Sequence, residues 1–207
     1  MAYGKLISFR YMIKNTFIII GLYLLFSTTA FGATYSGRVI DADTKKPIEG
    51  AVVVAVWLEE RATIAGPSSR LKDVKETLTG KDGAWVIKGP KGRRMGNIKA
   101  IVSFLTGTHF TKPPEFIIFK PGYCSWPAAF GIDACKEKMK YSDIGEGGVV
   151  ELPRLTERED RLKAYRVGPV SGVGAYKKQK EFIRLLNEES KTLGLPGIYE
   201  IPMEKEK

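Results

Sequence analysis

GRVIDADTKKPIEGAVVVAVW, residues 37–57, is the stretch that decides the fold of this chain. It begins with alternating residues, passes through a polar turn and ends in a nearly continuous apolar run at residues 51–57. Such a run is typical of a strand packed on both sides or lying at the centre of a sandwich. The turn chemistry comes from Asp41, Asp43, Thr44 and Pro47. Asx side chains bond nearby backbone amides and Pro fixes φ, so the stretch predicts a β-hairpin or a close relative of one.

A second turn divides VKETLTGKDGAWVIKG, residues 74–89, into two strand-like halves. Its Asp82-Gly83 pair is the strongest short-range turn signal in the chain. Further strands are expected from the apolar runs at residues 98–105, 115–120 and 148–152. Short strands joined by turn-rich segments, without helices between them, predict an antiparallel β-sandwich rather than a parallel α/β sheet. The class is therefore all-β at least as far as Leu152.

A set of spaced glycines, prolines and small apolar residues gives the first half of the chain a more specific pattern. Its members are Gly37, Val39, Asp41, Thr44, Pro47, Ile48, Gly50, Ala51, Val53 and Val54, then Thr79, Asp82, Gly83 and Trp85, then the KPGY element of Lys120, Pro121, Gly122 and Tyr123. Over roughly residues 35–152 this pattern resembles the carboxypeptidase regulatory-like family. The resemblance implies a prealbumin-like Greek-key sandwich. It implies no activity, because such modules occur beside peptidases, in surface proteins and as stand-alone exported proteins.

The N-terminal segment has the three-part plan of a secretory signal. Three basic residues, Lys5, Arg10 and Lys14, precede an apolar run at residues 17–26 and a small-residue stretch. Cleavage after Gly32 puts Ala30 and Gly32 in the two positions that must be small, so the mature chain is predicted to begin at Ala33. The alternative is an uncleaved membrane anchor, but the apolar run is shorter than the roughly 20 residues that cross a bilayer. The protein is expected in the periplasm, on the cell surface or outside the cell, with no membrane span after cleavage.

The composition is that of an ordinary globular protein, with 43% hydrophobic and 27% charged residues. Loss of the three basic residues of the signal lowers the formal net charge from +10 to +7. This basicity favours acidic polysaccharide, phospholipid headgroups or nucleic acid by non-specific attraction, and it identifies none of them. An envelope protein or an acidic polysaccharide is the suggested partner, and no specific nucleic acid is expected. A purely solubilising charge is the alternative.

Two segments depart from the family pattern. Residues 124–147 form an insertion in the predicted sandwich domain, residues 33–154, and residues 155–207 form a C-terminal extension. In the extension, Thr156 and Glu159 predict a capping box for a short helix to about Tyr165. A second helix is expected from about Ala175 to Leu193, with one apolar and one basic face. Docking of this helix on its own domain is favoured over contact with a membrane, because acidic residues dilute its basic face.

The insertion carries both cysteines and a group of aromatic residues. A disulfide between Cys124 and Cys135 is expected, since they are the two cysteines of an exported chain; two reduced buried thiols are the alternative. Tyr123, Trp126 and Phe130 lie in or beside this loop as a candidate binding surface. Attraction to an acidic partner would come from Lys120, Lys136, Lys138 and Lys140. The competing interpretation is that the rings fold back and seal the core of the sandwich.

Catalytic and metal-binding patterns give little signal, so neither catalytic residues, metal nor cofactor is predicted. His109, the one histidine, belongs to no zinc or nucleophile motif and is expected in a loop or in packing. Asp41 and Asp43 resemble paired carboxylates, but their turn needs Asx residues for structural reasons. Residues 172–174 lack the Gly-Lys-Ser/Thr ending of a phosphate loop and are expected to be a hinge.

Two functions from different classes stay open. The favoured one is a non-catalytic binding or structural module of the cell envelope, and the other is an enzyme whose site is assembled from dispersed residues. A carrier of small hydrophobic ligands would rest on analogy of fold alone. A filled sandwich with a flat exposed face would favour binding, whereas a deep pocket with convergent Asp, Glu, His109 or Lys side chains would favour an enzyme.

Overall fold

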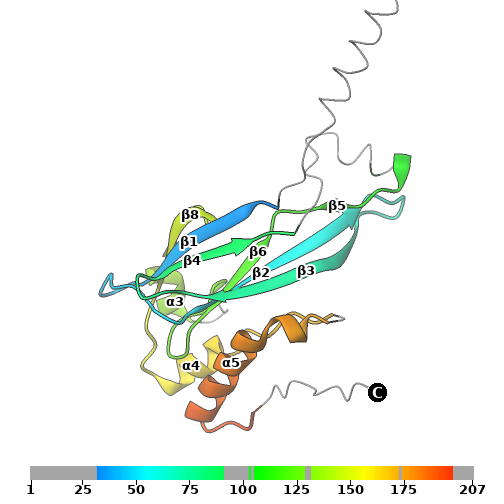
Figure 1. Ribbon diagram of the computed structural model, residues 1–207. Coiled ribbons are helices and arrows are strands. Elements are labelled where there is room, and N and C mark those ends of the chain that lie inside the picture. Colours follow the sequence, from blue (N-terminus) through cyan, green and yellow to red (C-terminus); the bar gives the residue numbers. More distant parts are fainter. Residues whose placement is uncertain (1–31, 91–102, 104, 129–131, 173, 198–207) are drawn as a thin grey trace, which may run out of the picture. The chain divides into compact units, whose positions relative to one another are not determined.

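The computed structural model describes residues 32–90, 103, 105–128, 132–172 and 174–197, and these form two β-sheets with a C-terminal helical segment (Figure 1). Sheet A has the strand order β4 (Ala84–Lys88), β1 (Thr34–Asp41), β8 (Glu146–Leu152), β7 (Lys140–Tyr141). Sheet B contains β3 (Ser68–Leu78), β2 (Val52–Arg61), β5 (Phe110–Thr111) and β6 (Glu115–Phe119). The strands pair antiparallel except for β1 and β8, which run parallel. The predicted sandwich of β-sheets is thus present.

Strand β2 is buried on both faces, as its apolar run predicted. Val53, Ala55 and Trp57 point into the core between the two sheets, where Val39, Trp85 and Ile118 meet them. The alternate residues of β2 point the other way and meet Phe182 and Leu186 of the C-terminal segment in a second core. Figure 1 shows the C-terminal helices on the side of sheet B that faces away from sheet A. The period of two along β2 therefore builds both cores.

The first turn is a crossover between sheets, so the prediction of a hairpin between residues 37–57 was wrong. Strands β1 and β2 lie in different sheets, and only a short bridge joins Ile40 to Pro47. Pro47 has no N–H to continue a ladder, and Gly50 at φ 67° turns the chain toward sheet B. The buried Thr79 hydroxyl fixes this corner by donating to the Ile48 carbonyl at 2.6 Å and accepting from the Ala51 N–H at 2.8 Å.

The apolar run at residues 98–105 was predicted to be a strand, and its described part is not. Ser103 and Leu105 are helical; the remainder of the run lies outside the described residues. A short apolar run does not by itself distinguish a strand from a buried helical turn. The insertion also contains a helix, α3 (Asp133–Lys138), so the region before Leu152 is mostly rather than entirely β.

The C-terminal extension contains α4 (Arg158–Ala164), a 3₁₀ turn η1 (Tyr176–Lys178) and α5 (Lys180–Thr192). Helix α5 docks on sheet B through its apolar face, which confirms the expected docking. The expected capping box is absent, because α4 has Glu157 at its N-cap and no side-chain cap hydrogen bond. The two helices are joined by Arg161, which donates two hydrogen bonds of 2.8 and 2.7 Å to the buried carboxylate of Glu189. No described helix is long and apolar enough to cross a membrane.

A carboxylate from sheet B caps helix α5. Glu76 on β3 accepts hydrogen bonds from the backbone N–H groups of Glu181 and Phe182 at 2.8 and 3.0 Å. These donors lie in the first turn of α5, where backbone N–H groups lack partners within the helix. Glu76 therefore does from a distant strand what a local N-cap residue does in most helices.

Replacing Glu76 with Ala should lower the free energy of unfolding by about 1–2 kcal/mol, because two N–H groups of α5 lose their acceptor. Chemical denaturation measures this change. Glu146→Ala, which removes an exposed carboxylate of β8, is the matched control and should change stability by less than about 0.5 kcal/mol. Equal stabilities of the two variants would contradict the capping role.

Candidate functional site

The predicted disulfide joins Cys124 to Cys135, and no free cysteine remains. Both cysteines are buried in a small third core with Ile132, Leu155 and Ala164, so the bridge lies within the insertion and this core packs the insertion against the C-terminal extension. The Cys124 N–H donates to the Pro153 carbonyl at 2.9 Å, which holds the start of the insertion beside the chain that leaves β8. The disulfide loop is thus anchored on one side by the fold and closed on the other by the bond.

Two of the three predicted binding residues pack against the sandwich. Tyr123 and Trp126 are half-buried and contact the main core, as the competing interpretation expected, and Phe130 lies outside the described residues. Trp126 forms a two-way backbone bridge with Ile118 of β6, at 2.9 and 2.8 Å. Its ring therefore lies beside the β6 edge of sheet B.

Tyr141 completes this surface, and sequence reasoning missed it. It lies on β7, the short edge strand of sheet A, and its ring centroid is 4.2 Å from that of Trp126. We call Trp126 and Tyr141 the aromatic pair; it closes the open side of the sandwich between the edges of the two sheets. Trp126 faces the core, whereas Tyr141 keeps 61% of its surface exposed. The available sequence signal was the aromatic residue directly after Lys138-Met139-Lys140, but nothing local indicated its partner.

The lysines expected around this surface divide into two groups. Lys120 donates to the backbone carbonyl of Glu49 at 2.9 Å, and Lys138 pairs with Asp43 at 3.1 Å. Both lysines therefore make contacts within the fold. Lys136 and Lys140 are exposed, and no ion pair is recorded for them among the described residues. These two lysines lie between the residues of the aromatic pair in the sequence, and their side chains are open to solvent.

Asp41 and Asp43, the paired carboxylates of the sequence, have structural roles. Asp41 is buried, and one of its oxygens accepts from the backbone N–H groups of Asp43 and Thr44 at 3.0 and 2.8 Å. Burial raises the pKa of Asp41, but the hydrogen bonds from Thr44, Asp43 and the Tyr123 hydroxyl outweigh it and leave the pKa below its ordinary value. Asp43 instead reaches Lys138, so the two carboxylates do not share one site.

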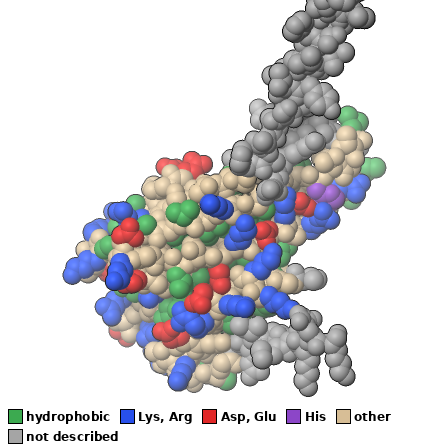
Figure 2. Space-filling view, in the orientation of Figure 1, with side chains coloured by type: hydrophobic (Ala, Val, Ile, Leu, Met, Phe, Trp, Pro, Cys, Tyr) green, Lys and Arg blue, Asp and Glu red, His purple; other side chains and the backbone are tan. Residues whose placement is uncertain are grey.

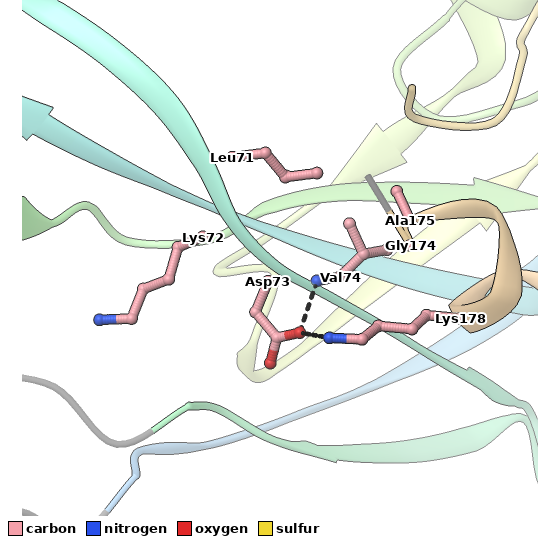
Figure 3. A pocket seen from close by; sticks show the side chains of 7 residues that line it. All are labelled: Leu71, Lys72, Asp73, Val74, Gly174, Ala175 and Lys178. Carbon is pink, nitrogen blue, oxygen red and sulfur yellow. Dashed lines mark hydrogen bonds and ion pairs between the residues drawn. The ribbon is translucent and has the colours of Figure 1, made fainter. Parts of the chain in front are cut away.

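A groove of about 220 Å³ lies where β3 meets the C-terminal segment (Figure 3). Its lining residues are Leu71, Lys72, Asp73, Val74, Gly174, Ala175 and Lys178. The Asp73 carboxylate accepts from Lys178 and from the Val74 N–H, and Lys72 reaches Glu59 at 3.0 Å. Because these charged groups already have partners, the groove is a joint that holds the extension to sheet B. Gly174 belongs to this joint, in the segment that the sequence suggested as a hinge.

Other chemistry expected from single residues is dispersed. His109 is half-buried just before β5, with no nucleophile–base pair recorded for it. Within the described ranges, no three His, Cys, Asp or Glu side chains gather as a metal site.

No family model and no curated protein matches this sequence. Two similar solved structures are a mutant of Acinetobacter radioresistens catechol 1,2 dioxygenase, at 18% identity and TM-score 0.28, and 3-chlorocatechol 1,2-dioxygenase from Rhodococcus opacus, at 14% identity and TM-score 0.27. Each alignment covers 63% of this chain, and it spans 54% and 62% of those proteins. TM-scores this low carry no argument about fold or activity.

The disulfide should contribute about 2–3 kcal/mol to the free energy of unfolding, because it closes a short loop in the unfolded chain. Denaturant melts of the oxidised and the reduced protein measure the difference. Intact mass after alkylation of unreduced protein should show no adduct. Two adducts on native material would mean that the thiols are free.

Stability should depend on pH through Asp41. Since its pKa is lower folded than unfolded, its charge stabilises the native state above the unfolded pKa, and this contribution is lost as the pH falls through the folded pKa. Asp41→Asn should therefore cost about 1–2 kcal/mol at neutral pH, and less in acid. Urea melts across a pH series test this. Asp133→Asn at an exposed site is the control, and a cost for Asp41→Asn that did not shrink in acid would contradict the assignment.

Proposed function

We propose that this chain is an exported, non-catalytic binding module of the cell envelope, built on the prealbumin-like Greek-key sandwich of the carboxypeptidase regulatory-like family. Support for the family comes from the residues that carry the resemblance, which lie at structurally demanding places. Gly50 and Gly83 have positive φ, and Thr79 holds the corner between sheets. Support for export comes from the signal-like segment at residues 1–32 and from the Cys124–Cys135 disulfide.

The space between the two sheets is filled, so a ligand is expected to bind at the surface. The space between the sheets is packed with buried side chains, among them Trp57, Trp85 and Leu152. The outer face of sheet B is covered by α5. A ligand would therefore meet the outer face of sheet A, where Val86 is 57% exposed, or the margins of the sandwich.

The aromatic pair is the observation that carries the proposal. Tyr141 presents a largely exposed ring that contacts Trp126. Lys136 and Lys140 lie near it in the sequence, and within the described part of the chain no ion pair is recorded for them. A flat ring with few rotatable bonds loses little entropy on binding and offers an apolar face to a sugar ring. Lysines attract carboxylate or phosphate groups. This combination suits an acidic polysaccharide, and an acidic patch of an envelope protein is the other partner that shares its chemistry.

Tyr141→Ala and Trp126→Ala should separate binding from stability. Tyr141→Ala removes an exposed ring, so binding to alginate should weaken about five-fold or more while the melting temperature hardly changes. Trp126→Ala removes a ring that packs on the core and should cost about 2–3 kcal/mol. Alginate serves as an acidic probe and dextran as a neutral one, in affinity electrophoresis with parallel thermal melts.

Tyr176→Ala is the matched control for the binding measurement. Tyr176 is 36% exposed on η1, in the C-terminal extension, and its loss should leave alginate binding unchanged. If Tyr141→Ala bound alginate as the parent does, the aromatic pair would serve only to close the sandwich. Affinity capture from the native envelope then identifies whether a protein takes the place of the polysaccharide.

A further inference from the structure

Strands β2 and β3 continue past the main core as a paired arm. After Trp57, the last β2 residue in that core, the register shifts and four more residue pairs follow, from Leu58–Leu71 to Arg61–Ser68. The connection at the tip is a tight turn in which the Gly66 N–H donates to the Thr63 carbonyl at 3.1 Å. We call residues 58–71 the arm.

The arm is stiffened on both sides. Strand β5 pairs with Glu59 and Glu60 along the edge opposite β3. Arg70 donates two hydrogen bonds to the Glu59 carboxylate, at 3.0 and 2.8 Å, and Lys112 reaches Glu60 at 2.8 Å. These contacts hold the carboxylates of the arm in ion pairs and connect β2 to both of its neighbouring strands.

The tip region displays the two most exposed large apolar side chains of the described residues. Ile64 is 96% exposed on the turn, and Leu105 is 76% exposed on the neighbouring segment. That segment is held to the arm because the Ala62 N–H donates to the Ser103 hydroxyl at 2.9 Å. Figure 2 shows hydrophobic side chains at this end of the molecule beside Lys, Arg and His side chains. Ile64 on the turn and Leu105 on the segment held to it thus leave apolar side chains open to a partner at this end of the described chain.

The charge around the tip is positive. Arg61, Arg70, Lys72 and Lys112 outnumber Glu59 and Glu60. Glu59 is paired with Arg70 and Lys72, and Glu60 with Lys112, whereas no ion pair is recorded for Arg61 among the described residues. A cation next to exposed apolar side chains is complementary to a surface that is anionic outside and apolar just beneath.

We propose that the arm inserts Ile64 and Leu105 into the headgroup region of an anionic lipid membrane, with Arg61 on the lipid phosphates. A convex turn with two apolar side chains is too small for a stable protein interface, which buries roughly 800 Å² on each partner. A bilayer surface accepts single side chains, and basic residues add to the affinity. This peripheral contact is independent of the polysaccharide site.

Vesicle binding tests the proposal on the chain from Ala33 to Lys207, which contains every residue of the described cores and the disulfide. Sucrose-loaded vesicles of phosphatidylglycerol and phosphatidylethanolamine in equal parts are sedimented with the protein, and phosphatidylcholine vesicles serve for comparison. We expect binding to the anionic vesicles that falls with added salt. Ile64→Ser and Leu105→Ser should each weaken it about five- to ten-fold.

Val86→Ser is the matched control, because it removes an exposed apolar side chain from sheet A and should leave vesicle binding unchanged. Alginate binding should be the same in Ile64→Ser as in the parent, so that failure here is distinct from failure of the polysaccharide site. Equal binding of the parent, Ile64→Ser and Val86→Ser to vesicles would overturn the proposal. So would self-association that Ile64→Ser abolishes in the absence of lipid, since a second copy would then be the partner of the tip.

Discussion

Burial of β2 on both faces is the constraint on which the rest of this structure depends. An ordinary sandwich strand buries one face and leaves the other to water, but here Val52, Val54 and Val56 face away from sheet A. Leaving three adjacent valines on an open sheet would create an apolar patch prone to association. The C-terminal extension removes that patch by laying Phe182 and Leu186 over it. The extension is therefore a third layer of the domain, and the domain needs it.

Docking of α5 also decides which surfaces are left for function. The apolar face of α5 packs on sheet B, and Glu76 caps its first turn. Its buried Glu189 forms an ion pair with Arg161. A basic amphipathic helix with its apolar face free would suit a membrane, but this helix has none to offer. The apolar face of α5 is therefore closed to a partner. The aromatic pair and the arm, by contrast, carry exposed apolar side chains on strands and turns of the sandwich.

Most strands, turns and helices could be predicted from local sequence pattern. The features that could not be predicted depend on contacts between residues that are distant in the sequence. The turns at Asp41 and Asp82, the two-faced strand at residues 52–57 and the apolar face of α5 all follow from spacing along the chain. The same spacing does not state which sheet a strand joins, so a crossover at Gly50 was taken for a hairpin. The pairings of Glu76 with α5 and of Tyr141 with Trp126 could not be predicted, because they join separate elements and no local pattern indicates them. The sequence thus indicated Trp126 as a candidate binding residue but did not indicate Tyr141, whose ring lies against it.

Strand β2 links the aromatic pair to the arm. Val53 of β2 pairs with Ile118, whose backbone in turn bridges to Trp126, and the same strand runs on to form the arm. Roughly 25 Å of strand separates Val53 from Arg61, at the usual rise per residue. A ligand on the aromatic pair would therefore not cover the arm tip. Because hydrogen-bonded strand rather than flexible linker joins the two, the proposed polysaccharide site and the proposed membrane contact lie at a set spacing within the domain.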